Sequence, residues 1–291
     1  MELKPLIRTY TALDGYRIHY RHWKPSAPPL ARIVAVHGIQ SHSGWYSWST
    51  SELTAAGFEV IFLDRRGSGM NEPARGDASS VDALVNDLLL MLSDLRLEAR
   101  ITGAFIPTVL MGASWGGKLA TVASARRPDL IDGLALLYPG LRARVRATWW
   151  QQLQLSAAER LGIRQKRVAI PLEDPTLFTG SSRWQEFIRD DPLALHEVTV
   201  SFLLANRGLD RQLGECPPAV NQPVLLMLAG KDEIIDNRAT VRYVESFAST
   251  DRVVHEYEGA RHTLEFEPNR ERFVGDLIAW LRQVAAESLP R

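Results

Sequence analysis

The sequence Gly112-Ala113-Ser114-Trp115-Gly116 has the form G-x-S-x-G, and its flanks decide the fold. The apolar run 107–111 directly before it predicts a buried strand, and residues 115–127 predict a helix. A serine on a sharp turn between a strand and a helix holds its hydroxyl out at the sheet edge, close to the free N–H groups of the helix N-terminus. Glycine suits both flanking positions because a side chain there would crowd the turn. This context indicates a nucleophile at Ser114 rather than a plain connector.

Strands and helices alternate along most of the chain around this turn. The turn signal Asp14-Gly15 predicts a hairpin between strands over 8–12 and 16–23. Continuous apolar runs elsewhere are typical of parallel strands that are buried on both faces. The pattern predicts an α/β fold with a mainly parallel, doubly wound sheet and antiparallel N-terminal strands. Further strands are expected over 32–37, 58–63, 133–138, 223–229 and 252–257, and helices over 45–56, 79–98, 238–248 and 268–286.

One long segment, residues 140–222, interrupts this alternation. It contains mostly helical patterns and no run suited to a central strand. It is also too long to be a plain loop in a compact domain. We therefore expect a helical cap insertion over 140–222 and an α/β core formed by 1–139 and 223–291.

Composition limits the possible function classes. Hydrophobic residues make up 45% and charged residues 23% of the 291-residue chain, which is typical of a globular protein. The formal net charge is zero, so no overall field favours nucleic acid as a partner. No stretch approaches the about 18 uninterrupted apolar residues of a membrane span. The first residues carry no long apolar region of the kind found in signal peptides, so the expected location is cytoplasmic.

Motifs for metals and nucleotides are missing from the sequence. The single cysteine, Cys216, excludes an intrachain disulfide and a cysteine-based metal cage. There is no H-E-x-x-H motif and no Walker-type loop, and the turn 65–69 is only a loose glycine motif. We therefore expect no metal and no cofactor.

A serine nucleophile needs a base, and the base needs an acid that orients it. The carboxyl ends of parallel strands converge at one edge of a sheet, so these partners should follow later strands. Asp232 follows the strand that ends at Ala229, and His262 follows the strand that ends near Tyr257. The sequence therefore predicts a triad of Ser114, Asp232 and His262.

Other acids compete for the orienting role. Glu233 and Asp236 lie in the same loop as Asp232, which we favour because it comes earliest after the strand. Asp64 follows another strand, but its position is more typical of a structural acid that orders the turn 65–69.

The oxyanion that forms during acyl transfer needs two N–H donors. One is expected from Trp115, the residue after the nucleophile. The other is expected from the loop that follows the strand 32–37, with Ile39 as the first choice and Gln40 as the second. His37 is expected to close this loop by a hydrogen bond.

Several motifs together resemble one family. They are Val36-His37-Gly38, Leu63-Asp64-Arg65-Arg66-Gly67-Ser68-Gly69, Gly112-Ala113-Ser114-Trp115-Gly116-Gly117, Gly230-Lys231-Asp232, Gly259-Ala260-Arg261-His262 and, within the insertion, Asp191-Pro192-Leu193. The chain resembles α/β-hydrolases of the monoacylglycerol lipase or lysophospholipase-like group, also called serine aminopeptidase-like hydrolases. The resemblance implies the α/β-hydrolase fold. It also implies roles for Ser114 as nucleophile, His262 as base, Asp232 as its partner, and Ile39 and Trp115 as oxyanion donors.

The expected cap insertion contains candidates for contact with substrate or lipid. Residues 141–161 are rich in arginine and aromatic residues, and Leu141, Val145 and Trp149 would share one stripe of a helix there. Such a helix would either roof the substrate pocket or rest on an anionic lipid surface as a peripheral membrane contact. A second helix is expected over 195–211, with Val198, Phe202 and Ala205 packed along one side.

Four side chains are candidates for substrate binding, although the aromatic ones could equally fill the core of the cap. They are Gln40, Trp149, Phe178 and Trp184.

Together these observations predict a cofactor-independent serine hydrolase that cleaves a carboxylic ester with a fatty or otherwise apolar acyl group. A lipid-like substrate of the monoacylglycerol or lysophospholipid type is expected from the resemblance. The triad leaves other activities open on the same scaffold: a thioesterase, an amidase or iminopeptidase, or a cofactor-free perhydrolase. A ligand-binding receptor with a hydrolase fold and no turnover is the alternative outside the enzymes.

Overall fold

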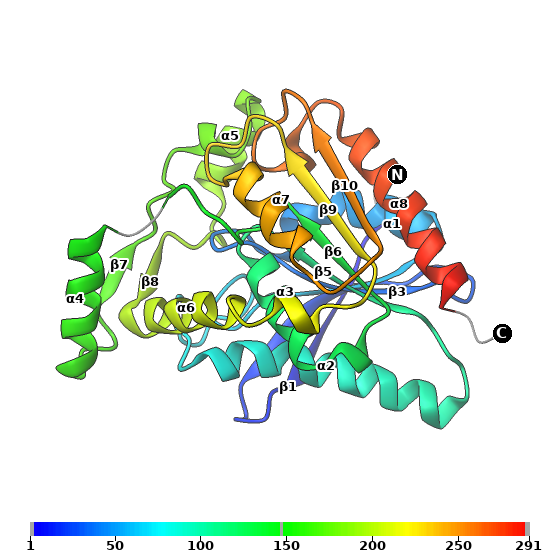
Figure 1. Cartoon of the computed structure of the whole chain (residues 1–291), viewed down its shortest axis with the longest axis horizontal. Coiled ribbons are helices and arrows are strands. Elements are labelled where there is room, and N and C mark those ends of the chain that lie inside the picture. Colours follow the sequence, from blue (N-terminus) through cyan, green and yellow to red (C-terminus); the bar gives the residue numbers. More distant parts are fainter. Residues whose placement is uncertain (1–2, 146–147, 289–291) are drawn as a thin grey trace.

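A computed structural model describes residues 3–145 and 148–288 and shows one central sheet with helices on both faces (Figure 1). The eight strands lie in the order β1-β2-β4-β3-β5-β6-β9-β10. The helices and strands are β1 (Leu6–Thr11), β2 (Arg17–Trp23), β3 (Arg32–Val36), α1 (Ser47–Ala55), β4 (Glu59–Leu63), α2 (Val81–Thr102), β5 (Thr108–Ala113), α3 (Gly116–Arg126), β6 (Gly133–Leu137), α4 (Trp149–Arg160), β7 (Arg167–Ala169), α5 (Ser182–Asp190), β8 (Glu197–Thr199), α6 (Val200–Leu213), β9 (Val224–Ala229), α7 (Asn237–Glu245), β10 (Arg252–Tyr257) and α8 (Arg270–Glu287).

The direction of the strands confirms the predicted architecture. The hairpin β1–β2 turns at Asp14-Gly15, where Gly15 has a φ of +83°, and β2 also runs antiparallel to β4. The six strands from β4 to β10 run parallel to one another. Parallel neighbours place the carboxyl ends of β3, β5, β9 and β10 at the same edge of the sheet, so the loops after these strands come together there.

Two apolar cores sandwich the sheet, because successive side chains of a strand point to opposite faces. Val34 and Val36 of β3 belong to the core that α2, α3, α6 and α7 cover. Ile33 and Ala35 belong to the core on the other face, beneath α1 and α8. All four side chains are fully buried, which accounts for the continuous apolar runs of these strands.

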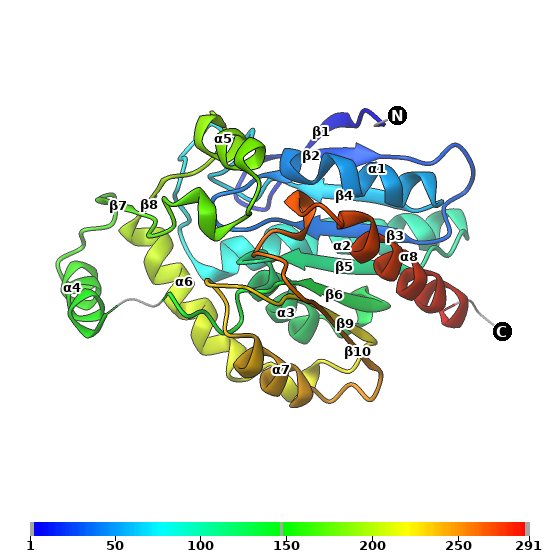
Figure 2. The same ribbon diagram turned by 90° about the horizontal axis from the view of Figure 1, so that it is seen from above.

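Residues 140–222, which we call the cap segment, lie between β6 and β9 in the chain. Within its described part, none of its strands joins the central sheet: β7 and β8 pair with each other in a separate antiparallel sheet. The sequence patterns missed this small sheet. The cap segment contacts loops of the core, since the Leu195 N–H donates to the carbonyl of Gln40 at 2.9 Å and Arg75 donates to the carbonyl of Leu193 at 3.0 Å. Figure 2 shows α5 and the β7–β8 pair at one end of the central strands and α4 at the periphery.

The predicted helix over 141–161 begins too early. Leu141 is buried in a turn, and Ala143 forms a β-bridge with Ile235, so neither is helical. The helix α4 begins at Trp149, where the Thr148 side chain accepts the N–H of Gln151 and caps it. Leu141 and Trp149 therefore do not share a helical stripe, and residues 146 and 147 of this prediction lie outside the described residues.

The predicted helix over 195–211 also begins too early. Residues 197–199 form β8, and the Thr199 hydroxyl then caps α6 by accepting the N–H of Phe202 at 3.1 Å. Val198, Phe202 and Ala205 are buried as expected, although Val198 belongs to the strand. Among the described helices, none is long and apolar enough to cross a membrane.

The turn between β5 and α3 is packed closely against its neighbours. A Cβ atom on Gly112 would lie 2.7 Å from the carbonyl oxygen of Gly116 and 2.7 Å from the Cα of Gly117. A Cβ on Gly116 would lie 2.5 Å from the carbonyl oxygen of Val36. Contacts this short with backbone atoms cannot be relieved by a rotamer change, so the first turn of α3 can approach β3 and β5 only because these positions are glycine.

We expect Gly112→Ala to lower the free energy of unfolding by about 1–3 kcal/mol, because the backbone of the turn must shift to make room. Gly275→Ala is the matched control: Gly275 is exposed on α8, and its added Cβ would meet no atom within 4 Å. This control should stabilise the chain by about 0.5–1 kcal/mol through helix propensity. Urea unfolding of the two variants and the native chain measures both effects, and equal stability of the two variants would contradict the packing argument.

Glu265 is a buried carboxyl group in a short 3-10 turn, Leu264–Phe266, just after His262. One of its oxygens accepts the N–H of Ser49 in the first turn of α1 at 3.0 Å. The other oxygen has no hydrogen-bond partner in the described part of the chain. Burial raises the pKa of Glu265 from 4.5 to about 7, because the charged form loses its hydration.

This shift makes stability depend on pH. A raised pKa means that the folded chain holds a proton which the unfolded chain has already released, so this contribution is complete below a pH of 4.5 and is lost as the pH rises to about 7. The loss is on the order of 3 kcal/mol.

We therefore expect Glu265→Gln, which cannot ionise, to become more stable relative to the native chain as the pH rises from about 5 to about 8. Urea unfolding at a series of pH values measures this difference. The exposed residue Glu245 provides the control, since Glu245→Gln removes a carboxylate that is not buried. A difference between Glu265→Gln and the native chain that is constant with pH would disprove the assignment.

Candidate active site

Ser114 lies on the sharp turn between β5 and α3, at the carboxyl edge of the sheet. Its φ is +51°, a left-handed conformation that is rare for a residue with a side chain. The Ser114 N–H donates to the carbonyl of Leu137 at 3.0 Å, and the Ser114 carbonyl accepts the N–H of Gly140 at 2.6 Å. The neighbouring strand β6 and the residues after it therefore hold the strained turn in place, as expected for strain that is stored at a functional site.

The imidazole of His262 lies between Ser114 and Asp232. Its Nε2 is 2.8 Å from Ser114 Oγ, and its Nδ1 is 2.8 Å from Asp232 Oδ2. The other oxygen of Asp232 accepts the N–H groups of Ile234 and Ile235 at 2.8 and 2.9 Å. An ionised carboxylate only accepts hydrogen bonds, so His262 Nδ1 carries the proton and donates it, and Nε2 is free to accept from the serine hydroxyl.

The competing acids of this loop have other partners. Glu233 is exposed and forms an ion pair with Arg261 at 3.3 Å. Asp236 accepts the N–H of Ala239 at 2.9 Å and thereby caps α7. Asp232 is hydrogen-bonded to His262, so the structure brings together the three residues that the sequence singled out.

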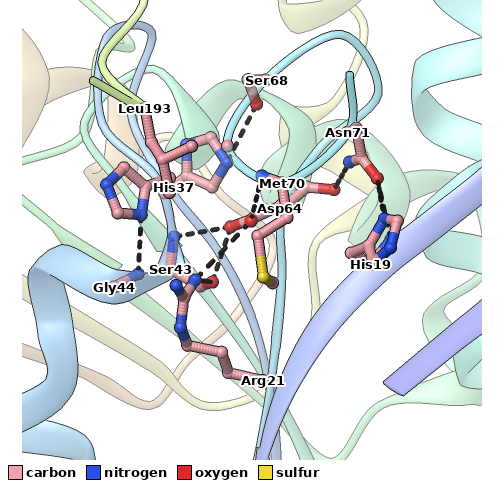
Figure 3. A network of polar contacts seen from close by, with 12 residues as sticks. His19, Arg21, His37, Ser43, Gly44, Asp64, Ser68, Met70, Asn71 and Leu193 are labelled. Carbon is pink, nitrogen blue, oxygen red and sulfur yellow. Dashed lines mark hydrogen bonds and ion pairs between the residues drawn. The ribbon is translucent and has the colours of Figure 1, made fainter. Parts of the chain in front are cut away.

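Asp64 is fully buried at the centre of a separate polar network, which Figure 3 shows. One of its oxygens accepts the N–H and the hydroxyl of Ser43 at 2.7 and 2.6 Å, and the other accepts the N–H of Met70 at 2.8 Å. Arg21 lies 3.6 Å from the same carboxylate. These bonds tie the loop after β3 to the loop after β4, which is the structural role that the sequence favoured for Asp64.

The loop after β3 passes close to the serine. A Cβ atom on Gly38 would lie 3.2 Å from the Cβ of Ser114, so the loop backbone is in contact with the serine side chain. His37 holds this loop: its Nδ1 lies 2.8 Å from the carbonyl of Gly38, and its Nε2 accepts the N–H of Arg65 at 3.1 Å. Burial lowers the pKa of His37 to about 3, so the ring is neutral and Nδ1 is the donor.

The N–H groups of Ile39 and Trp115 belong to the two chain segments that lie next to the serine. Ile39 follows Gly38, which contacts Ser114, and Trp115 directly precedes the first residue of α3. In the described part of the chain, neither N–H has a hydrogen-bond acceptor. Both donors are therefore free to bind an oxygen of a ligand, and the positive end of α3 favours negative charge at this position.

The four candidates for substrate binding lie in different surroundings. Phe178 contacts the catalytic histidine candidate, with 5.8 Å between the ring centres of Phe178 and His262. Gln40 is buried in the loop that follows β3, and its side-chain oxygen has no hydrogen-bond partner in the described residues. Trp184 stacks on Phe266 with ring centres 4.6 Å apart. The structure does not bring Trp149 to the triad: it is 61% exposed on the peripheral helix α4.

Two features of the site were missed by sequence reasoning. Tyr138 packs edge-on against His262 with 5.0 Å between ring centres and has a φ of +37°, and nothing in the sequence marks it. Asp191 joins the cap segment to the core, because it accepts from His42 at 2.9 Å and from the indole N–H of Trp45 at 2.6 Å. The motif Asp191-Pro192-Leu193 was the available signal, but its partners lie far away in the sequence.

The chain is similar to known proteins over most of its length. The monoglyceride lipase of Rattus norvegicus is 28% identical over 255 residues, which cover 87% of this chain and 82% of that protein. The phospholipase YtpA of Bacillus subtilis is 25% identical, with 86% of this chain and 93% of that protein covered. A solved structure of a soluble variant of monoglyceride lipase from Saccharomyces cerevisiae, in complex with a substrate analog, has a TM-score of 0.84 at 19% identity over 97% of this chain and 96% of that chain.

The family described as "Serine aminopeptidase, S33" matches residues 27–269, which is most of the chain. This match confirms the resemblance that the motifs indicated. The chain belongs to this family of α/β-hydrolases.

Proposed function

We propose that this chain is a serine hydrolase that cleaves the ester bond of lipid-like substrates with an apolar acyl group. The observation that carries the proposal is the continuous chain of hydrogen bonds from Asp232 through His262 to Ser114, with 2.8 Å at each side of the imidazole. The family and the relatives, which include monoglyceride lipases and a phospholipase, support the hydrolysis of lipid carboxylic esters.

The geometry supports a two-step mechanism through an acyl-enzyme. His262 Nε2 takes the proton of Ser114 Oγ as the oxygen attacks the ester carbonyl, and the Asp232 carboxylate stabilises the imidazolium that forms. The N–H groups of Ile39 and Trp115 bind the oxyanion. The imidazolium then donates its proton to the leaving alcohol, and a water molecule activated by the same imidazole releases the acid.

The surroundings of the triad favour an apolar acyl group. Phe178 and Tyr138 contact His262 on its faces, and Trp45 contacts Phe178 with ring centres 6.1 Å apart. Phe187, from the cap segment, also packs on Trp45 at 6.1 Å. Aromatic rings from the core and the cap segment thus gather around His262, which supports a role for residues 140–222 as a cap over the substrate.

Replacement of the triad residues should abolish turnover. We expect Ser114→Ala and His262→Ala to lower kcat for a short-chain p-nitrophenyl ester by several orders of magnitude, on the order of 10⁴–10⁶. His255→Ala is the control, because His255 lies on β10 at the edge of the sheet and pairs only loosely with Asp276 at 3.9 Å. Steady-state rates and labelling by a fluorophosphonate probe check the assignment. Near-normal turnover by His262→Ala would show that His262 is not the base. A native chain that the probe does not label would favour a ligand-binding receptor without turnover.

A substrate panel separates the activities that this scaffold allows. Monoacylglycerols and lysophospholipids of increasing chain length should be cleaved faster than an acyl thioester or an aminoacyl amide with the same acyl group. The proposal would be refuted by a preference for the thioester, which indicates a thioesterase, or for the amide, which indicates an amidase or iminopeptidase.

We also propose that α4 makes a peripheral contact with lipid surfaces. None of its side chains is buried, and Trp149 and Trp150 stack on each other with 61% of each exposed. Exposed basic residues follow in the chain: Arg160, Arg164, Lys166 and Arg167. Exposed tryptophans beside basic residues are typical of helices that lie in the interface of an anionic membrane.

This contact predicts co-sedimentation of the native chain with vesicles that contain phosphatidylglycerol. The double variant Trp149→Ala/Trp150→Ala should remain in the supernatant, because it loses the apolar face of α4. Leu97→Ala/Ile101→Ala is the matched control, since it removes two exposed apolar side chains from α2. The idea fails if the native chain is recovered in the supernatant equally with and without vesicles.

A further inference from the structure

Arg65 lies two residues after the end of β4. Its side chain points into the interior, next to the loop after β3 that contains Ile39. Only 3% of the residue is exposed. The guanidinium packs against the rings of both Trp115 and Phe202, which also contact each other: its carbon is 5.0 Å from each ring centre, and the two ring centres are 5.2 Å apart. Its Nη2 donates a hydrogen bond to the carbonyl of Ile39. One side chain therefore contacts both segments that provide the oxyanion donors.

The guanidinium of Arg65 is unusual because no carboxylate in the described part of the chain is hydrogen-bonded to it. Its neighbour Arg66 is paired with Asp87 at 2.7 Å and with Asp14 at 2.7 Å. In Arg65, by contrast, Nε and Nη1 have no partner among the described residues. Burial lowers the pKa of Arg65 to about 9, which still leaves it charged at neutral pH.

A buried cation without a hydrogen-bonded carboxylate destabilises the folded chain, and the charge of the neighbouring Asp64 and the cation–π contacts offset only part of that loss. Leucine or methionine would fill the same space without this penalty. Residues that destabilise the fold in this way are often found at functional sites, and Arg65 touches the two segments next to Ser114.

Resting on the proposed function, we propose that Arg65 is a positioning residue of the oxyanion hole: it holds the Ile39 and Trp115 segments in the arrangement that binds the oxyanion. Its backbone acts on the same loop, since the Arg65 N–H donates to His37, which in turn donates to the carbonyl of Gly38. Its side chain holds the carbonyl of Ile39 by a hydrogen bond and packs against the indole of Trp115.

The indole of Trp115 is also fixed from its far end. Its N–H donates to the side-chain oxygen of Asn206 on α6 at 2.8 Å, and the same oxygen lies 3.2 Å from Lys118 Nζ. With Arg65 against the face of the ring and Asn206 at its edge, the Trp115 side chain has little freedom. The backbone N–H of Trp115 is then held in place before a substrate arrives, which is what electrostatic stabilisation of a transition state requires.

A positioning role of this kind affects the transition state more than the ground state. The oxyanion exists only during the reaction, so a misplaced donor lowers kcat and leaves KM nearly unchanged. Loss of one donor in such a hole typically lowers kcat by about 10²–10³-fold, so a displaced but present donor should cost about 10–100-fold.

The test measures kcat and KM of Arg65→Met with p-nitrophenyl butyrate, together with the inhibition constant of an alkyl trifluoromethyl ketone, which forms a tetrahedral adduct with the serine. We expect kcat to fall by about 10–100-fold, KM to change by less than about three-fold, and the ketone to bind more weakly by the same factor as kcat/KM. Arg65→Lys keeps the charge and part of the reach, so it should recover part of kcat.

Arg96→Met is the matched control. Arg96 also donates to a backbone carbonyl, that of Leu130 at 3.2 Å, and lies over a ring, that of Phe105 at 5.5 Å. It differs from Arg65 in one respect, because it also forms an ion pair with Asp132 at 2.7 Å. Its contacts precede β6 and lie at the opposite edge of the sheet from Ser114. This variant should lose stability without losing kcat or affinity for the ketone.

Three results would overturn the inference. The first is a native kcat in folded Arg65→Met. The second is a loss of activity in Arg65→Met that follows its loss of folded protein, as in Arg96→Met, with unchanged affinity of the folded fraction for the ketone. The third concerns the case in which Arg65→Met does not fold. In that case, a native kcat and a native ketone affinity in both Arg65→Lys and Arg65→Gln would overturn the inference. Each of these leaves labelling of Ser114 in the native chain intact, whereas a native chain that neither labels nor hydrolyses esters would refute the proposed function itself.

Discussion

The close approach of α3 to the strands β3 and β5 is the constraint on which the rest of the site depends. Gly116 lies so near the carbonyl oxygens of Val36 and His37 that a methyl group would not fit, at 2.5 and 2.6 Å. This contact forces the sharp turn at Ser114 and brings the serine against Gly38. Because the segments of the proposed oxyanion donors, Ile39 and Trp115, adjoin this contact, the positions of the proposed nucleophile and of the donors follow from one packing contact.

The hydrogen-bond partners of each buried polar group then determine the role that the group can take. Asp232 accepts two backbone N–H groups as well as the imidazole, so its charge is balanced by fixed dipoles, and it orients His262 without needing a proton. His37, equally buried but without a carboxylate partner, stays neutral and serves only as a link between loops. The two histidines thus differ in role because their second nitrogen meets a carboxylate in one case and a backbone carbonyl in the other.

Much of this arrangement could be predicted from the sequence, and the reason is topological. Chain order and the parallel sheet together required the residues after β5, β9 and β10 to meet, so Ser114, Asp232 and His262 could be predicted to lie together without any knowledge of side-chain packing. The cap segment could not be predicted as well. There the hydroxyls of Thr148 and Thr199 cap α4 and α6 and so determine where these helices begin. The apolar stripes in the sequence extend further towards the N-terminus, so both helix starts were predicted too early. Tyr138, Arg65 and Asn206 also left no signal, because their importance lies in contacts between residues that are distant in the chain.

These distant contacts link the cap segment to the chemistry. The helix α6 presents Phe202 to Arg65 and Asn206 to Trp115, so the surface that a cap helix offers to the core is the same surface that supports one oxyanion donor. A displacement of α6 would remove the ring from one side of a buried cation and the acceptor from the indole N–H. Because both losses leave a polar group unsatisfied in the interior, the closed packing of α6 is favoured over small displacements. Shared contacts thus stabilise both the position of the cap segment and the proposed oxyanion hole. If residues 140–222 cover the substrate as proposed, substrate entry is expected to depend on parts of the cap segment that lie away from α6, such as α5 and its aromatic residues.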